Sequence, residues 1–366
     1  MIHLKLAAPF RNFQVGLTLV ELMVSLALSS ILIAGVFSLY LDSRGTDRMG
    51  TALARIQESG RFASEFMAKD IRMAGYQGCA DPNSVGMNII AKNPPTLNFA
   101  NSAMRGYEVT NTSWANGTEF DNTSIETRAL IGSDVIAIQR ATSADTQLTG
   151  NMGVVNANIQ ITDNALGLKA QDIILISDCE FADLFRATNV SSSGTKVTIA
   201  HSNSQNTSNF LSKAYDTSAK ILRFSSTVYF VADTGRDDLA GNPIYALYRQ
   251  SDNLLNSAYS AASFDIQELV EGVENMQILY GERLASGNVR FVPAGTAGLD
   301  MTQVVSVRIG LLISSPEDVQ QTTDKLTYAM PGEDIKPASS AGATVTHAED
   351  RRIRRTFLAT INLRNR

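Results

Sequence analysis

Few residues in this chain have the types and spacing that catalysis or metal binding requires. The sequence holds three histidines, His3, His201 and His347, and two cysteines, Cys79 and Cys179, and these five are scattered along it. A structural zinc site needs four nitrogen or sulfur ligands, and no phosphate-binding, dinucleotide-binding or C-x-x-C motif is present. We therefore expect no cofactor, no bound metal and no enzymatic activity.

One acidic residue stands in an unusual place. Glu21 is the only charged residue in an apolar run of 24 residues, Leu17–Tyr40. An acid inside a membrane span costs about 2.5–3.5 kcal/mol, so such an acid usually has a partner. If the chain is cut between Gly16 and Leu17, the new α-amino group lies one helical turn from Glu21 on the same face. Proteolysis would thus supply a positive charge for this carboxylate, within one subunit or from a neighbour.

The apolar run predicts a single membrane span. A helix of this length is roughly 36 Å long, which covers a hydrocarbon core of about 30 Å. Lys5 and Arg11 precede the run, whereas mixed charges follow it, so the N-terminus should be cytoplasmic and the body exported. A cleaved secretory signal would have a shorter apolar region followed by an A-x-A-like cleavage site, which Leu39–Ser43 matches poorly. A plain signal anchor fits the length but leaves Glu21 unexplained.

The string GLTLVELM, from Gly16 to Met23, resembles the processing site of type IV prepilins. In that superfamily a prepilin peptidase cuts after the glycine, the new N-terminus is methylated, and a glutamate follows at the fifth mature position. The resemblance implies that residues 1–16 are a leader and that Leu17, which stands where Phe is usual, begins the mature chain. Residues 17–41 would then form the transmembrane and assembly helix, in which Glu21 pairs charges between or within subunits.

The periodicity beyond the span predicts that the helix continues to about Ala74. No proline occurs between Phe10 and Asp81, and residues 42–76 should form the amphipathic second half, packed on a globular head. Gly45 and Gly50 favour a bend or local melting at the junction. The residues expected to face the head are Leu53, Ile56, Gly60, Ala63, Met67, Ile71 and Ala74. Within the span, Ser25 and Ser29 form a pair of small residues that would allow close helix approach.

Residues 77–366 are predicted to form a β-rich head, which makes the fold class α+β with an antiparallel sheet. Polar stretches such as Asn111–Ser124 and Ser191–Asn209 should be surface loops. The segments rich in Val, Ile and Tyr that we expect to be strands are Val135–Ala141, Asp172–Ser177, Lys196–His201, Thr227–Ala232, Ile244–Arg249, Met276–Tyr280, Val304–Ser314 and Thr356–Leu363.

The two cysteines are expected to form a disulfide. Cys79 and Cys179 are 100 positions apart, and both fall in the part predicted to be exported to an oxidising compartment. A loop of this length corresponds to about 4–5 kcal/mol in the chain-entropy treatment. A reactive thiol is the alternative, although no Lys or His stands near either cysteine in sequence to lower its pKa.

Two polar clusters can each be interpreted either as ordinary surface structure or as a binding site. Arg351, Arg352, Arg354 and Arg355 should form a solvated entrance to the last strand, the alternative being contact with DNA or an acidic partner. With a net charge of −5, the chain is not expected to bind nucleic acid with high affinity. The Asp233–Asn242 stretch, which holds three aspartates, is expected to be an ordinary turn, because its spacing does not match a calcium-binding EF-hand.

Several further segments resemble PilW-type minor pilins and the related J-type minor pseudopilins of type II secretion. They are Asp70–Cys79, Leu175–Cys179, Leu269–Met276 and Arg352–Phe357. The resemblance implies a low-abundance subunit that helps initiate type IV pilus assembly in a tip or priming complex, supporting twitching motility, adhesion or DNA uptake. Its implied partners are the other minor pilins and the major pilin through their N-terminal helices, prepilin peptidase, the inner-membrane assembly platform and a tip adhesin.

The same resemblance implies a location. The chain would sit in the inner membrane with a periplasmic head, and then in the extracellular pilus. Two alternatives stay open: a minor pseudopilin of a type II secretion or competence system, and a signal-anchored periplasmic enzyme or ligand-binding domain. The last alternative predicts that the bond after Gly16 is not cut.

Overall fold

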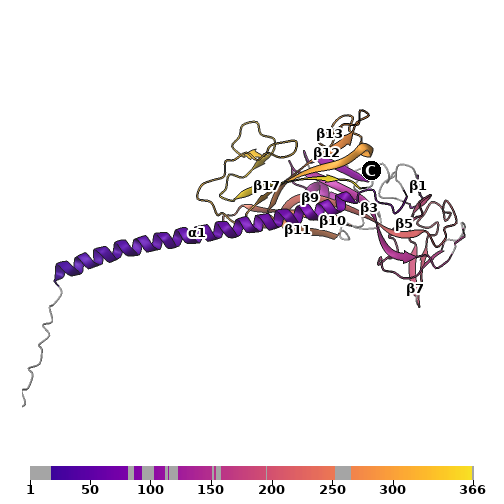
Figure 1. Ribbon diagram of the computed structural model, residues 1–366, viewed down its shortest axis with the longest axis horizontal. Coiled ribbons are helices and arrows are strands. Elements are labelled where there is room, and N and C mark those ends of the chain that lie inside the picture. Colours follow the sequence, from indigo (N-terminus) through magenta and orange to yellow (C-terminus); the bar gives the residue numbers. More distant parts are fainter. Residues whose placement is uncertain are drawn as a thin grey trace, which may run out of the picture. The chain divides into compact units, whose positions relative to one another are not determined.

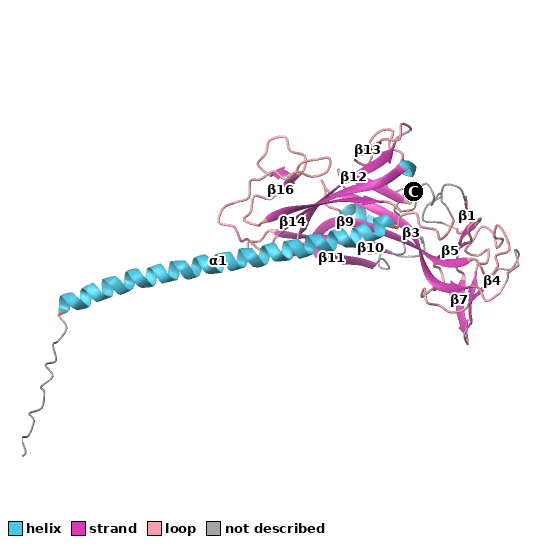
Figure 2. Ribbon diagram, in the orientation of Figure 1, coloured by secondary structure: helices cyan, strands magenta, loops and turns pink. Residues whose placement is uncertain are grey.

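A computed structural model describes residues 18–80, 86–92, 103–111, 114, 123–150, 152–153, 158–194, 196–251 and 265–364 (Figures 1 and 2). The chain divides into two compact units, Met1–Thr51 and Ala52–Arg366. The described part of the first unit is helical, and the second unit combines the end of that helix with β-sheets. Helix α1 therefore contributes to both units.

Helix α1 spans Leu19–Arg72, within two residues of each predicted end (Figure 1). It stays α-helical at Gly45 and Gly50, so the local melting predicted there is absent. Two glycines cost about 2 kcal/mol relative to alanine, which is too little to break a helix that is otherwise rich in helix-forming residues. In residues 18–51 the side chains are exposed.

The second half of α1 packs on the head along the predicted face. Ile56, Ala63, Met67 and Ile71 are at most 1% exposed and belong to the largest apolar cluster of the head. At Gly60 the helix lies against the ring of Phe357, and a Cβ atom at this position would overlap that ring. Close approach of the helix to the sheet therefore explains why a glycine occupies the middle of this buried face.

The strands of the described residues form four sheets (Figure 2). The largest has the order β1-β6-β5-β9-β10-β11, with β3 pairing β9 and β2 pairing β3. Its strands are β1 (Met87–Ile89), β2 (Met104–Glu108), β3 (Asp134–Gln147), β5 (Ile173–Ser177), β6 (Ala182–Arg186), β9 (Lys220–Asp237), β10 (Pro243–Ser251) and β11 (Asp265–Glu271). Most neighbours are antiparallel, whereas β1 and β6 are parallel.

The other sheets are smaller. A four-stranded sheet has the order β13-β12-β14-β17 and packs its apolar face against α1. The bounds are β12 (Val273–Arg283), β13 (Val289–Val292), β14 (Val304–Ser314) and β17 (Arg354–Asn362). A three-stranded sheet joins β4 (Asn158–Ile161), β8 (Lys196–Ala200) and β7 (Asn189–Ser193), and a two-stranded parallel one joins β15 (Lys336–Pro337) and β16 (Thr346–His347). The short helices are α2 (Thr123–Arg128) and the 3₁₀ turn η2 (Met301–Gln303).

The eight predicted strands fall on β3, β5, β8, β9, β10, β12, β14 and β17, which confirms them. The prediction that Ser191–Asn209 is a loop was wrong for its first half, because Ser191–Ser193 belong to β7 and Lys196–Ala200 form β8, whereas residues 201–209 contain no strand. The serines of β7 are exposed and pair with β8 through the backbone, so the strand has no apolar alternation to reveal it. Most of Asn111–Ser124 lies outside the described residues, although Thr123 begins α2.

The disulfide joins the end of α1 to the large sheet. Cys79 and Cys179 are bonded to each other, with their Cα atoms 4.9 Å apart. Cys179 follows β5, and Cys79 lies seven residues beyond the end of α1, in the second of two turns that contain Gly75 and Gly78, both of which have positive φ. The bond therefore anchors the chain where it leaves the helix.

The prediction of a solvated arginine cluster was wrong for two of its four members. Arg352 and Arg354 are 3% and 2% exposed, whereas Arg351 and Arg355 are exposed. The Arg354 guanidinium donates to Glu274 at 2.6 and 3.1 Å, and also to carboxylates from other segments. The acids that surround the two buried arginines are Asp238, Glu274, Asp324 and Asp350. Tertiary packing has gathered these acids from distant segments, which local sequence does not reveal.

The Asp233–Asn242 stretch, predicted to be a turn, is divided between two structures: Asp233–Asp237 end the strand β9, and Asp238–Asn242 form the turn that leads to β10. The Asp238 carboxylate accepts hydrogen bonds from the backbone N–H groups of Ala240 and Asn242 and from Arg352. Although desolvation opposes it, these bonds and those from the Asn242 side chain lower the pKa of Asp238. Its oxygens are thus engaged by the turn and by the buried arginine.

Candidate assembly site

Helix α1 begins with a capping box that the sequence analysis missed. The Thr18 backbone N–H donates to the Glu21 carboxylate at 2.9 Å, and the Thr18 hydroxyl lies 3.0 Å from the same oxygen. In return, the Glu21 N–H lies 3.3 Å from the Thr18 hydroxyl. This reciprocal pattern satisfies donors that a helix start leaves unpaired. The signal was visible as T-x-x-E directly before an apolar run.

The capping box gives the Glu21 carboxylate hydrogen-bond donors even in the uncut chain. The α-amino group predicted at Leu17 would therefore be an additional partner of this carboxylate and not its first. Gly16 and Leu17 lie outside the described residues, and the pairing of this amine with Glu21 stays a prediction. The carboxylate lies at the positive end of the helix, where a negative charge is favoured.

The first half of α1 presents apolar side chains on all sides. The segment is long and apolar enough to cross a membrane, and none of its apolar stretch is buried against the described residues. The Ser25 hydroxyl donates to the Glu21 carbonyl at 2.7 Å, and Ser38 donates to Ala34 at 3.0 Å. Because these serines bond to their own helix, they are compatible with a lipid or helix-packed environment.

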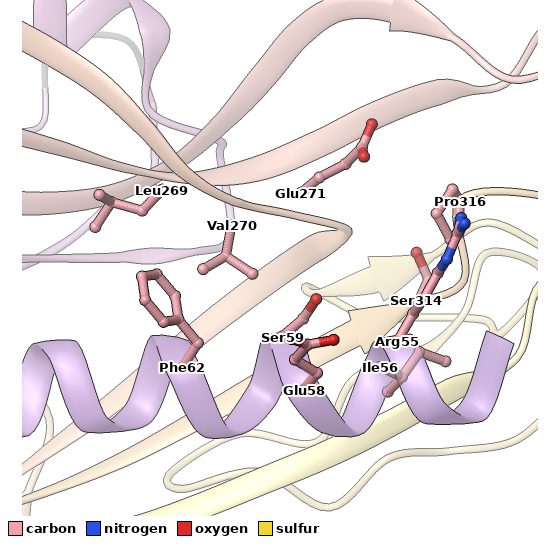
Figure 3. Close-up of a pocket in the computed structure, with 10 residues that line it drawn as sticks. All are labelled: Arg55, Ile56, Glu58, Ser59, Phe62, Leu269, Val270, Glu271, Ser314 and Pro316. Atoms are coloured by element: carbon pink, nitrogen blue, oxygen red, sulfur yellow. The ribbon is translucent and has the colours of Figure 1, made fainter. Parts of the chain in front are cut away.

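A pocket of about 380 Å³ lies between the second half of α1 and the strand β11 (Figure 3). Arg55, Glu58 and Phe62 line it from the helix, and Leu269 and Glu271 line it from β11. Phe62 is 47% exposed, so its ring is accessible as well as the charged groups. Such a mixture of charges and one aromatic ring is suited to ion pairs and apolar contacts with another chain.

The head also contains a pair of neighbouring acids, of which Asp134 is buried and Glu108 is half-buried. Glu108 of β2 and Asp134 of β3 lie directly opposite each other in register, and Asp134 accepts a hydrogen bond from the Ile278 N–H at 2.6 Å. Burial and the neighbouring Glu108 charge raise the pKa of Asp134 well above its usual value, and burial also raises the pKa of Glu108. Nearby, the hydroxyl of Tyr280 is buried and has no hydrogen-bond partner among the described residues. This pair is a site where protonation and packing are linked.

Comparison with known families gives two matches at separate places in the chain. Residues 228–365 match the family described as type IV pilus-assembly protein W, and residues 12–37 match the prokaryotic N-terminal methylation motif. A search of curated proteins finds no match. The first match covers the part of the head from β9 to β17, and the second covers Gly16, the capping box and the first half of α1. With the long apolar helix and the antiparallel-rich β head, these matches support a type IV pilus minor pilin similar to the pilus-assembly protein W family.

Proposed function

We propose that the precursor is cut after Gly16 and that the mature chain helps to initiate type IV pilus assembly within a tip or priming complex. The observation that carries this proposal is the junction at the start of α1, where the methylation motif, the Thr18–Glu21 cap and an uninterrupted apolar helix coincide. In this proposal the initiated pili serve twitching motility, adhesion or DNA uptake.

The exposed apolar surface explains why assembly must be coupled to leaving the membrane. Fifteen large apolar side chains between Leu19 and Leu41 are at least half exposed. At about 1.5–3 kcal/mol for each buried side chain, moving them from lipid into water would cost tens of kcal/mol. The helix can therefore leave the bilayer only when helices of neighbouring subunits take over the burial.

The freed amine and Glu21 would set the axial position of the subunit during that transfer. The Thr18 cap leaves the negative charge of Glu21 without a counter-charge, and a net charge among apolar helices is costly. Subunits are therefore favoured in the one register that brings a positive N-terminus beside it. The proposed partners are accordingly the N-terminal helices of other minor pilins and of the major pilin. Prepilin peptidase and the inner-membrane assembly platform act earlier, and a tip adhesin would contact the head.

In this proposal the location changes during the process. Before assembly the mature chain is anchored in the inner membrane with its head in the periplasm, and after assembly it lies in the extracellular pilus. The pocket between α1 and β11 belongs to the head, and its exposed Phe62 ring would be available to a neighbouring subunit.

The test uses three chromosomal variants in the native host. Gly16→Ala should leave an unprocessed precursor, detected by intact mass and N-terminal sequencing. Glu21→Ala should be processed and inserted normally yet reduce the number of pili, seen by electron microscopy and sheared-pilus yield. Glu65→Ala, which removes an exposed acid from the same helix outside the apolar segment, is the matched control and should behave as wild type.

Normal mature mass in the Gly16→Ala strain, or normal piliation in the Glu21→Ala strain, would count against the proposal. If instead pili are unaffected and protein secretion fails, the chain serves a type II secretion system. A deletion strain complemented by each variant distinguishes loss of the subunit from loss of its assembly.

A further inference from the structure

A second pocket, of about 360 Å³, lies on the head and is unrelated to the assembly function proposed above. Three arginines line it, together with several hydroxyl-bearing side chains. The lining residues used below are Arg140, Thr142, Arg223, Ser225, Thr227, Arg249 and Ser251. In a chain with a net charge of −5, a hollow that gathers three guanidinium groups is unexpected.

The strand register places these groups on one face of the large sheet. Arg223, Ser225 and Thr227 alternate along β9, so they point to the same side, while Leu222, Phe224 and Val228 point into apolar clusters. Across the ladder, Arg140 of β3 is opposite Ser225, and Thr142 is opposite Arg223. On the other side of β9, Ser251 of β10 is opposite Thr227 and Arg249 is opposite Tyr229. Three adjacent strands therefore build a shared polar floor.

The positive charge of the pocket is only partly balanced by acids. Arg140 pairs with Asp70 at 3.1 Å, and Arg223 lies 3.7 Å from Asp172. Arg249 donates to the amide of Gln267 at 3.0 Å and lies over the Phe66 ring, neither of which carries a negative charge. Counting these groups gives 3 − 2 = +1. The Asp70 carboxylate is further shared with the hydroxyl of Tyr229 at 2.7 Å.

Two guanidinium donors are left without partners in this region. The Nε atoms of Arg140 and Arg249 are both buried and make no hydrogen bond. A buried N–H group without an acceptor costs free energy, and a guanidinium charge increases that cost. Because these two Nε atoms are buried, an oxyanion in the pocket would instead contact the accessible parts of the arginines, such as Arg140 and Arg223, whose side chains are 22% and 31% exposed. The guanidinium fork matches carboxylate and phosphate oxygens.

We propose that this pocket binds a small hydroxylated oxyanion, of the class of sugar phosphates and sugar acids. The arginines would hold the phosphate or carboxylate, and the hydroxyls of Thr142, Ser225 and Ser251 would contact the ligand's own hydroxyls. The volume falls within the range of small-molecule sites, at about 300–1,000 Å³, and is too small for a folded partner.

The experiment titrates the full-length mature protein in detergent, by calorimetry, with four probes at low and at moderate salt. Glucose 6-phosphate and glucuronate carry the two anionic groups, inorganic phosphate tests the anion alone, and glucose is the neutral control. We expect at least one anionic probe to bind at millimolar concentration or below, at least tenfold tighter than glucose. Which probe binds best separates the phosphate source from the carboxylate source.

Three variants link that binding to the pocket. Arg249→Gln should weaken binding at least tenfold, whereas Arg283→Gln, which removes an exposed arginine at the end of β12, should leave it unchanged. Ser225→Glu places a carboxylate among the arginines and should abolish binding while raising the melting temperature. If Arg249→Gln fails to fold, Ser225→Glu alone decides the question. Equal binding in Ser225→Glu, or no anionic probe binding better than glucose, would overturn the proposal.

Discussion

Replacing Arg354 by methionine tests whether the buried arginine network holds the head together. The Arg354 side chain is 0% exposed and contacts Glu274, Asp324 and Asp350 at 2.6, 3.1 and 2.8 Å. These acids come from β12, from the segment after β14 and from the approach to β17. The network contains two arginines and four acids, so its formal charge is 2 − 4 = −2, and the substitution changes it to 1 − 4 = −3.

The expected loss is large because the acids stay buried without their cation. Removing one partner of a buried ion pair costs about 3–5 kcal/mol, and Arg352 compensates weakly, since it lies 3.6 Å from Glu274 and 3.7 Å from Asp350. For a unit of about 300 residues, with about 2.1 cal/mol/K of unfolding entropy per residue, this corresponds to a fall in melting temperature of about 5–8 °C. Acidification should reduce the stability difference between Arg354→Met and wild type, because the carboxylates left without Arg354 can then take up protons.

The assay is thermal and urea unfolding of the purified mature chain at pH 7 and at pH 5. Arg355→Met is the control, because it removes a neighbouring arginine that is exposed on the same strand, and it should change stability by less than about 0.5 kcal/mol. In Arg354→Met, Glu274→Gln should restore part of the loss by removing one stranded charge. If Arg354→Met is as stable as Arg355→Met at pH 7, the network does not carry the stability assigned to it here.

Three further changes have defined outcomes. Asp134→Asn should become more stable relative to wild type as pH rises from 4.5 to 8. The pKa of Asp134 is raised in the folded protein, so its protonated form stabilises wild type fully only below the unfolded-state pKa, near 3.9, and this stability is lost as pH rises. A stability difference that does not change with pH in urea titrations would contradict the shared burial of Asp134 and Glu108. Replacing Cys79 and Cys179 together by serine should lower the unfolding free energy by about 4–5 kcal/mol in denaturant titrations, and an unchanged midpoint would argue against the chain-entropy treatment. Thr18→Val should remove the cap and destabilise the start of α1 by about 1 kcal/mol, so amide hydrogen exchange in the first helical turn, measured in micelles, should become faster. An unchanged exchange rate would show that the cap is dispensable.

The sequence could predict those features that depend on short-range pattern. The apolar run fixes the span, the three-and-four spacing fixes the buried face of α1 at Ile56, Ala63 and Met67, and alternation reveals strands such as β17. The motif around Gly16 carries the processing prediction without any fold. Even the capping box, which was overlooked, can be read from four consecutive residues because its hydrogen bonds stay within one helical turn.

Other features depend on which strands become neighbours, and these only the tertiary structure decided. Arg354 has the same local sequence context as the exposed Arg355, and it is buried because acids as far away in sequence as Glu274 reach it. Likewise, the arginine pocket exists because β3, β9 and β10 align in one register, so that Arg140 and Arg249 flank the same face. Local propensity acts within a few residues of the backbone, whereas burial and charge are set by long-range packing, and that is why the anchor could be predicted and the charge networks of the head could not.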